Sequence, residues 1–378
     1  MPLGVYVHLA FCPYLCPYCD FAKWPYRASA ARRYLEALEE ELDSVPKRPA
    51  ATVFIGGGTP NTYDATTLAA LVSRVRAHFA SDISHEVTVE VNPELVRADD
   101  FPAYRDAGVT RLSIGVQSFD ADEARTLGRK HSLRDVERAV AWARKARVPS
   151  VSVDLIFAVP GQTPHSWRTS LQRAIALGVD HISTYGLTVE EGTPYASVRA
   201  RDPGWFLDDA VEAQLYEIAM DELGTAGYEQ YEISNFARPG HRCAHNENYW
   251  ANGEYVGMGV GAASYVGGVR STHARNLSAY VDAALAHVPI PGESERLDGT
   301  RRAGEAMMLA LRTAQGVGLR AFKERYDIDV LTLYANPIAE YTSTGLLERH
   351  GDFVRLTRRG RLFANDVCAA FLEVPPSA

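Results

Sequence analysis

The sequence predicts an α/β fold, in which an open, partial barrel of six βα units is followed by a smaller C-terminal α+β domain of winged-helix type. Two observations carry this prediction. Apolar, β-branched segments alternate with amphipathic segments over about the first two hundred residues, and the alternation stops near residue 205. Repeated βα units imply a parallel sheet. Because six units are too few for a closed eight-stranded barrel, we expect an open one, with a doubly wound sheet as the alternative.

The barrel is expected to span residues 1–227. Its predicted strands are residues 4–9, 52–58, 86–93, 111–118, 151–161 and 181–188. The amphipathic segments 31–42, 65–79, 135–146 and 164–177 lie between them, and a further helix is predicted over 208–223. Their apolar residues recur three and four positions apart, which is the spacing of one helix face.

The rest of the chain follows a different pattern. Residues 228–299 are expected to form a connecting segment, which is polar as far as 250 and glycine-rich after that. Residues 300–372 are expected to form the winged-helix-like domain. Its predicted helices are 301–314, 318–326, 329–345 and 359–372, with a hairpin over 346–357.

Composition bounds the class of protein. A chain of 378 residues with 46% hydrophobic and 23% charged residues is ordinary for a soluble globular protein. A net charge of −8 argues against a protein that binds nucleic acid, which usually presents a basic surface. Neither a secretory signal nor an apolar run of roughly 20 residues is evident, so we expect a cytoplasmic location, where thiols stay reduced.

Three of the five cysteines, Cys12, Cys16 and Cys19, form a C-x3-C-x2-C cluster just after the first predicted strand. Clustered thiols in a reducing compartment favour a metal site. Two interpretations are open: a zinc knuckle with His8 as the fourth ligand, or an iron–sulfur cluster that leaves one iron without a protein ligand. The cluster is favoured, because zinc knuckles are usually small autonomous units and this loop adjoins a large predicted sheet.

Unusual residues also lie within or just after the next strands. They are Gly56–Thr59, Glu90, Gln117 and Asp154. The carboxyl ends of parallel strands meet at one edge of a sheet, so we expect these residues to share a site with the cysteines. The glycines would let backbone groups approach a ligand. The carboxylates could accept hydrogen bonds from it, while Gln117 and Arg129 could donate them.

The cysteine cluster, with Tyr18 before its last cysteine, resembles the signature of the radical S-adenosylmethionine (SAM) superfamily. The narrower resemblance, to the anaerobic coproporphyrinogen oxidase group of that superfamily, covers nearly the whole chain and rests on "FIGGGTP", "EVNPE", "SIGVQSF", "LGRKHS" and "DLIFAVPGQT". The pattern departs at Ala10, where the group commonly has proline.

This resemblance implies a radical SAM partial (βα)6 barrel. It also implies a four-iron four-sulfur (4Fe-4S) cluster on Cys12, Cys16 and Cys19, with SAM bound at the open iron. The residues implied to contact SAM are Tyr6, Tyr18, Gly57, Gly58, Thr59, Glu90, Gln117, Arg129 and Asp154.

Two functions are consistent with the resemblance. One is an oxygen-independent coproporphyrinogen III oxidase, in which reductive cleavage of SAM starts the decarboxylation of porphyrinogen propionates. The other is a haem chaperone of the HemW-like group, which binds haem and transfers it. Three features favour the chaperone: Phe21 stands where the oxidase has a further cysteine, the chain starts directly on its first strand without the oxidase's N-terminal extension, and "HNENYW" at His245–Trp250 matches the H-N-x-x-Y-W motif of the chaperone group. Whether the protein is an enzyme is left open.

The motif implies that His245 ligates haem iron and that Tyr249 and Trp250 pack against the macrocycle. His241, His273 and Cys243 are rival ligands, and Cys243 ranks second because a thiol with a pKa of ~8.5 is mostly protonated at neutral pH. Since the motif follows the last βα unit, we expect it to fold over the barrel mouth. The implied partners are haem or a porphyrin and a haem-accepting protein, with no nucleic acid. Peripheral membrane contact through that acceptor, and a dimer, are left open.

Overall fold

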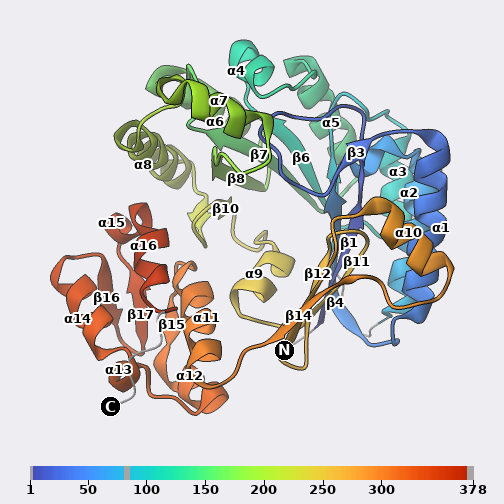
Figure 1. The fold of residues 1–378 in the computed structure, drawn as a ribbon. Helices are drawn as coiled ribbons and strands as arrows, with labels where there is room; N and C mark the ends of the chain where they lie inside the picture. Colours follow the sequence, from blue (N-terminus) through green and yellow to red (C-terminus); the bar gives the residue numbers. More distant parts are fainter. Residues whose placement is uncertain (1–2, 81–85, 373–378) are drawn as a thin grey trace.

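A twelve-stranded sheet forms the centre of the computed structural model, which describes residues 3–80 and 86–372 (Figure 1). Six parallel strands lie side by side in chain order: β1 (Leu3–Leu9), β4 (Ala50–Gly57), β5 (Glu86–Val91), β6 (Arg111–Gln117), β7 (Ser150–Phe157) and β8 (His181–Gly186). A doubly wound sheet would instead have its first strand in the middle. The partial barrel predicted from the sequence is therefore confirmed, and each predicted strand overlaps an observed one.

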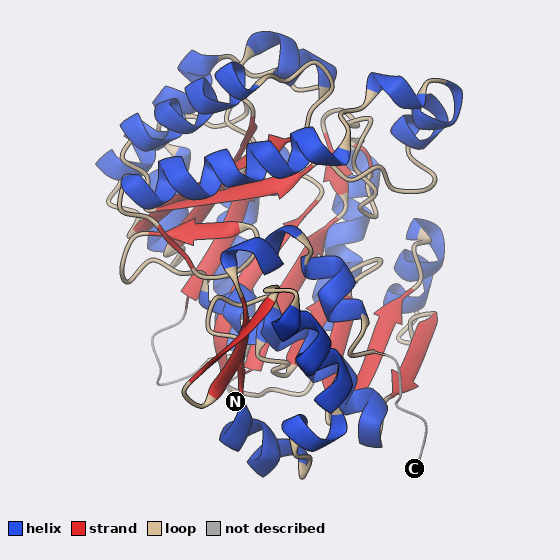
Figure 2. Cartoon of the chain, turned by 90° about the vertical axis from the view of Figure 1, so that its left-hand side faces the viewer, coloured by secondary structure: helices blue, strands red, loops and turns tan. Residues whose placement is uncertain are grey.

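Helices cover the outer face of this sheet, as the side view in Figure 2 shows. They are α1 (Ala28–Ser44), α2 (Ala65–His78), α3 (Asp100–Asp106), α4 (Ala121–Thr126), α5 (Leu133–Lys145), α6 (Pro164–Ala176), α7 (Pro194–Arg201) and α8 (Asp209–Thr225). Helix α5 illustrates why they form. Ser132 and Asp135 make a reciprocal capping box at its start, and the helix buries Val136, Ala139 and Val140 on one face.

The strands turn alternate side chains to the two faces of the sheet. On β4, Val53 and Ile55 are fully buried in the core under the helices. Phe54, which lies between them, faces the barrel interior and lines a cavity there. This period of two carries the polar residues Glu90 and Asp154 into the same interior.

Residues 228–299, which were expected to be a connecting segment, add strands to both edges of the sheet. Strands β9 (Glu229–Gln230) and β10 (Asn235–Ala237) extend it beyond β8. On the other edge, β11 (Tyr255–Met258) pairs in parallel with β1, and β12 (Ala263–Val266), β13 (Val269–His273) and β14 (Gly292–Arg296) follow it antiparallel. Helix α10 (Leu277–Leu285) packs against α1.

Helix α9 (Ala244–Trp250), which carries the "HNENYW" motif, lies at the amino ends of the barrel strands. Glu86, at the start of β5, accepts hydrogen bonds from the backbone N–H groups of Ala244 and His245 at 2.9 and 3.0 Å. This carboxylate satisfies donors that the first turn of a helix leaves free. The expectation that the motif folds over the barrel mouth is therefore wrong, because the mouth lies at the opposite, carboxyl ends of the strands.

The C-terminal part of the chain has a hydrophobic core of its own, drawn from residues between Ala303 and Phe371. Its helices are α11 (Gly299–Leu311), α12 (Leu319–Tyr326), α13 (Val330–Leu333), α14 (Ala335–Ser343), α15 (Arg358–Leu362) and α16 (Ala364–Ala369). Its sheet contains β15 (Val317–Gly318), β16 (Leu347–His350) and β17 (Phe353–Leu356). This is the α+β arrangement expected from the sequence, and it lies beside the open side of the barrel (Figure 1).

None of the helices in the described part of the chain combines the length and the apolar character that crossing a membrane requires.

Candidate functional site

The three clustered cysteines lie on the loop that follows β1. The short strands β2 (Phe11–Cys12) and β3 (Trp24–Pro25) pair at the base of this loop. The glycine-rich loop after β4 is bound to the same segment, because Gly58 N–H donates to Leu9 O at 2.8 Å and Thr59 N–H donates to Phe11 O at 2.9 Å. Backbone hydrogen bonds thus hold the two loops together at the carboxyl ends of the strands.

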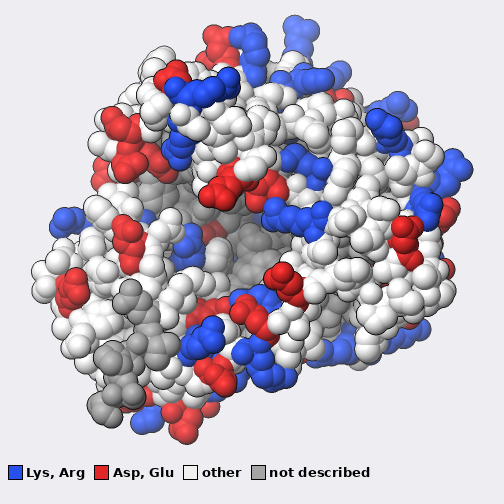
Figure 3. Space-filling view, viewed as in Figure 1, with Lys and Arg blue, Asp and Glu red and all other residues white. Residues whose placement is uncertain are grey.

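All three cysteines line one cavity of about 410 Å³ inside the barrel. The surface is hollowed between the barrel and the C-terminal domain, with acidic and basic side chains around the rim (Figure 3). The residues predicted to contact SAM that line this cavity are Tyr18, Gly57, Gly58, Thr59, Glu90, Gln117, Arg129 and Asp154. Tyr6 is the exception, because it lines a second cavity described below. Residues from separate βα units therefore meet as the sequence predicted.

The alternative of a zinc site with His8 as fourth ligand does not fit the geometry. Tyr6 donates its hydroxyl hydrogen to His8 Nδ1 at 2.9 Å, and His8 Nε2 donates to Ala22 O at 2.7 Å. Both ring nitrogens are therefore occupied. Within residues 3–80 and 86–372, no three His, Cys, Asp or Glu side chains are grouped around a point that one metal ion could fill. Cysteines of an iron–sulfur cluster bind separate irons, so they need not converge on one point.

Burial keeps the thiols of Cys12 and Cys19 protonated in this arrangement. It raises the pKa of Cys12 to about 11, and it also raises the pKa of Cys19. A metal centre binds thiolates, so its binding to these residues would release protons. The donor set, three thiols on one loop in a shared cavity, fits a cluster that leaves one iron without a protein ligand.

The glycines of the loop after β4 are needed for close contact. Gly57 has a φ of 104°, and a Cβ atom there would lie 2.3 Å from the His8 ring. A Cβ atom on Gly58 would lie 2.6 Å from Leu9 O and 2.8 Å from Phe11 O. The chain can follow this path, and present bare backbone to the cavity, only with glycine at both positions.

Two of the carboxyl groups that line this cavity come from strands β5 and β7. Glu90 Oε2 accepts a hydrogen bond from Gly57 N–H at 3.2 Å, and burial, together with the nearby Asp154, raises the pKa of Glu90 to about 8. Asp154 accepts hydrogen bonds from Ser113 at 2.8 Å and Ser183 at 2.7 Å, and burial raises its pKa in spite of them. Glu90 is therefore largely neutral at pH 7 in the absence of a cation.

Hydrogen bonds hold the side chain of Arg129 in place at the wall of the cavity. Its Nη2 atom donates to Asn92 Oδ1 at 2.8 Å and to Gly115 O at 2.7 Å. Its Nη1 atom lies 4.0 Å from Cys16 Sγ, and its buried Nε atom has no hydrogen-bond partner. The guanidinium therefore places a fixed positive charge beside a cysteine of the cluster motif.

A β-bulge sets the direction of Gln117. The pairing of β6 with β7 shifts between Gly115 and Gln117, so that Gln117 lies opposite Leu155. Leu155 is fully buried in the core, whereas Gln117 lines the cavity. The φ of Gln117 is 66°, which is a left-handed conformation. It turns the Gln117 side chain to the cavity face of the sheet, whereas Leu155 points to the core face.

A second cavity, of about 390 Å³, lies along β1 and β11 and reaches from the cysteine loop down to α9. Its aromatic lining consists of Tyr6, Phe21, Phe54, Tyr249 and Tyr255, and its basic lining consists of Arg270 and Arg275. Phe21 also lines the first cavity, so this one side chain borders both. Sequence reasoning singled out Phe21 only as the position where a cysteine is lacking.

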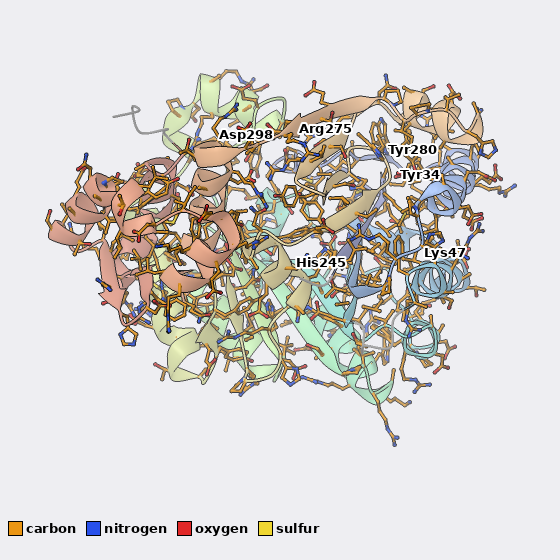
Figure 4. All side chains as sticks on the ribbon, turned by 90° about the horizontal axis from the view of Figure 1, so that it is seen from below. Tyr34, Lys47, His245, Arg275, Tyr280 and Asp298 are labelled. Carbon is orange, nitrogen blue, oxygen red and sulfur yellow. The ribbon has the colours of Figure 1, made fainter. Side chains whose placement is uncertain are left out.

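His245 lies at the inner end of the second cavity, near the middle of the molecule in Figure 4. Its side chain is buried, and its Nδ1 and Nε2 atoms lie 2.8 Å from Thr52 Oγ1 and 2.9 Å from the Tyr249 hydroxyl. Burial lowers the pKa of His245 to about 3, so the imidazole is neutral. Both of its ring nitrogens are therefore hydrogen-bonded, one to Thr52 and the other to Tyr249.

The rival iron ligands lie away from this cavity. Cys243 is buried, donates its thiol hydrogen to Glu86, and has a pKa raised to about 12 by burial. His273 Nδ1 donates to Gly259 O at 2.9 Å. His241 Nε2 lies 4.0 Å from Asp180 Oδ1 on the outside of the barrel. Trp250 packs under the guanidinium of Arg312, at 5.6 Å from its ring centroid.

Comparison with known proteins adds to this geometry. Residues 6–174 match the radical SAM superfamily, and residues 297–363 match the HemN C-terminal domain. A protein of Bacillus subtilis named heme chaperone HemW is 34% identical over 98% of this chain and 99% of its own length. The proteins of that name from Mycobacterium tuberculosis H37Rv and Escherichia coli K12 are 36% and 33% identical, again over 98% of this chain, and over 95% and 98% of their own lengths.

Among solved structures, the coproporphyrinogen III oxidase HemN of Escherichia coli superposes with a TM-score of 0.86. The match covers 98% of this chain and 90% of that one, at 24% identity. At that identity, the superposition shows a shared fold.

Proposed function

The chain belongs to the HemW family of radical SAM proteins, and on that premise we propose that it binds haem and transfers it to an acceptor protein. The observation that carries the proposal is the match, over nearly the full length of both chains, to relatives named heme chaperones. Phe21 supports it, because this aromatic side chain occupies the position of an additional oxidase cysteine and borders both cavities.

We also propose that the first cavity holds a 4Fe-4S cluster and SAM. The cluster would be bound by Cys12, Cys16 and Cys19, and when present it would supply one electron to SAM at its open iron. The other cavity residues would bind and orient SAM. The glycine loop offers backbone groups at close range, and Glu90 and Asp154 offer acceptors to the amino and hydroxyl groups of the ligand.

Charge complementarity supports this assignment. Arg129 Nη1 lies 4.0 Å from Cys16 Sγ, so a fixed positive charge would lie beside the negatively charged thiolates of a bound cluster. Glu90 is neutral in the empty cavity, but a cationic ligand would favour its charged form. SAM carries such charges on its sulfonium and ammonium groups. Binding of a cationic ligand would therefore favour loss of the Glu90 proton, which leaves a negative charge beside the ligand.

The test is anaerobic reconstitution with iron and sulfide, followed by two separate assays. In the first, haem is titrated into the protein, and the loaded protein is mixed with apomyoglobin as a model acceptor. We expect a Soret band on loading and transfer of haem to apomyoglobin. In the second, coproporphyrinogen III, SAM and a reductant are supplied. Decarboxylation of the porphyrinogen would overturn the chaperone proposal in favour of the oxidase.

Peripheral contact with a membrane through the acceptor protein, and dimer formation, stay predictions.

A further inference from the structure

The chemistry of the second cavity indicates the class of ligand that it would take. Its volume of about 390 Å³ falls within the usual range for ligand pockets, roughly 300–1,000 Å³. Aromatic side chains dominate its walls: the rings of Tyr6 and Phe54 lie 6.2 Å apart, and those of Tyr249 and Tyr255 lie 4.6 Å apart. Phe21 is 56% exposed where the cavity meets the first one. Such walls suit a flat aromatic ligand.

The basic residues of the cavity add a preference for carboxylates. Arg270 is already paired with Glu305 and Glu295. Arg275 is more accessible, because its side chain is 62% exposed. Its Nη1 atom donates to Asp20 O at 2.9 Å and lies 3.6 Å from Asp20 Oδ2. A guanidinium carries five donors, so the others are available to a ligand. In Figure 4, Arg275 lies on the segment after β13, apart from His245. A ligand in this cavity would therefore meet aromatic rings at its centre and a cation at its edge.

His245 is poorly placed to ligate a metal in this cavity. Its side chain is buried, and a bond from either ring nitrogen to iron would break a hydrogen bond, to Thr52 or to Tyr249. Tyr249 also lines the cavity and is less buried than His245, and its hydroxyl lies 2.9 Å from His245 Nε2. Phenolate oxygen is an established protein ligand of haem iron.

The hydrogen-bond chain Thr52–His245–Tyr249 supports this role. A neutral imidazole carries one proton, on either nitrogen. If Thr52 donates its hydroxyl hydrogen to Nδ1, the proton of His245 is on Nε2 and is donated to the Tyr249 oxygen. That arrangement stays intact when the phenol loses its own proton. Burial raises the pKa of Tyr249, so the phenol keeps its proton until a metal ion binds its oxygen. His245 can then donate a hydrogen bond to the tyrosinate without itself becoming charged.

We propose that Tyr249 binds the ferric iron of haem in the second cavity, with His245 as the positioning residue that hydrogen-bonds the ligating oxygen and Arg275 as the partner of a propionate. This inference rests on the proposed haem binding and replaces His245 as the iron ligand. On binding, an Fe–O bond forms, the phenolic O–H bond breaks, and the proton leaves to solvent. The iron stays ferric, so no oxidant or reductant is needed.

The test compares Tyr249→Phe, His245→Ala and Tyr265→Phe with the wild type, using the full-length, cluster-loaded protein and ferric haem. Tyr265 lies on β12 but does not line the cavity, so Tyr265→Phe is the matched control. Each protein is titrated with haem and examined by resonance Raman spectroscopy for iron–tyrosinate vibrations. Iron content and melting temperature show whether each variant is folded.

We expect tyrosinate vibrations in the wild type and in Tyr265→Phe, and their loss in Tyr249→Phe. His245→Ala should keep them, at shifted frequencies, and bind haem roughly 10–100-fold more weakly, as is typical when the hydrogen-bond partner of a metal ligand is removed. Arg275→Gln should weaken the binding of haem more than the binding of its dimethyl ester.

The outcomes separate the two proposals. If the wild type does not bind haem, the proposed function falls, and this inference falls with it. If the wild type binds haem, but Tyr249→Phe leaves the spectrum and the affinity unchanged, the ligand assignment is wrong while the function stands. A wild-type spectrum typical of imidazole ligation, lost in His245→Ala, would also overturn it.

Discussion

The backbone N–H of Gly57 donates to Glu90 Oε2 at 3.2 Å, so the bare loop after β4 and the acidic side chain of β5 form one wall of the cysteine-lined cavity. A side chain on the loop and a charge on the carboxyl group would each disturb this wall, one by steric overlap and the other by desolvation. The two effects can be tested separately.

Gly58→Ala should destabilise the protein and abolish SAM binding, because its Cβ would lie 2.6 Å from Leu9 O and 2.8 Å from Phe11 O, both backbone atoms. Gly224→Ala is the control: it lies in α8, and a Cβ there would meet nothing within 4 Å. Replacing glycine by alanine within a helix should stabilise the protein by roughly 0.5–1 kcal/mol. Thermal unfolding and calorimetric titration with SAM measure the two effects. Equal melting temperatures for both variants would contradict the steric argument.

The pKa of Glu90 predicts how stability depends on pH. Its pKa of about 8 in the folded protein exceeds the value of about 4.3 expected in the unfolded chain. Between these values the folded state holds the proton that the unfolded state has lost, so the free energy of unfolding falls as pH rises through this window. In Glu90→Gln, the free energy of unfolding should decrease less between pH 5 and pH 8 than it does in the wild type.

Urea denaturation of the cluster-free protein at several pH values measures this effect. Glu137→Gln, at an exposed position on α5, is the control and should leave the pH profile unchanged. Asp154 also has a raised pKa, so part of the decline should remain in Glu90→Gln. A profile identical to that of the wild type would show that Glu90 is ionised in the folded protein.

Glu90 should also release its proton when SAM binds, because a nearby cation favours the carboxylate. Calorimetry in two buffers that differ in ionisation enthalpy measures the number of protons released. Glu90→Ala should abolish the release and weaken binding by roughly ten- to a hundredfold, since losing a hydrogen bond to a charged group costs about 1.5–3 kcal/mol. Unchanged affinity in this variant would remove Glu90 from the site.

Alanine at Cys12, Cys16 or Cys19 should lower the iron content of anaerobically reconstituted protein and bleach its brown colour. Each cysteine is expected to bind one iron, and no other cysteine lines the cavity within the described residues. Cys368→Ala is the control, because Cys368 lies in the core of the C-terminal domain. A colourless wild-type protein that carries a single zinc ion would contradict the cluster.

Arg325 connects the C-terminal domain to helix α9. It donates hydrogen bonds to Ala251 O at 2.7 Å and Asn252 O at 2.6 Å, where the carboxyl end of the helix carries partial negative charge. Arg325→Met should therefore lower the free energy of unfolding by about 1 kcal/mol. Arg320→Met removes an arginine that is 83% exposed, and should change it by less than about 0.5 kcal/mol. Equal effects of the two substitutions would show that the contact with α9 is unimportant.

Much of the barrel could be predicted because its strands are short, apolar and bounded by amphipathic helices. The predicted segment 65–79 corresponds to α2 (Ala65–His78), and 164–177 corresponds to α6 (Pro164–Ala176). The cavity residues could be predicted for a related reason. The carboxyl ends of parallel strands converge, so Glu90 and Asp154 had to face one region.

The segment after α8 could not be predicted in the same way. Strands β11–β13 are short, are joined by glycine-containing turns and have no alternating pattern. The pairing of β11 with β1 joins residues about 250 positions apart. The position of α9 depends on Glu86, a residue with no distinctive motif, whose carboxylate binds the amino end of that helix. Long-range contacts of this kind leave no local signal, and the second cavity that they create was therefore missed.

The left-handed backbone of Gln117 sets stability and ligand recognition against each other. A residue other than glycine at a φ of 66° is strained by roughly 1–2 kcal/mol, and here the bulge in β6 enforces that conformation. Laboratory evolution for heat resistance alone would therefore favour glycine at position 117. A variant with glycine at this position would have an unstrained backbone, but it would lack the side-chain amide that β6 presents to the cavity. Thermostable variants of this protein should therefore be screened for SAM affinity before they are used.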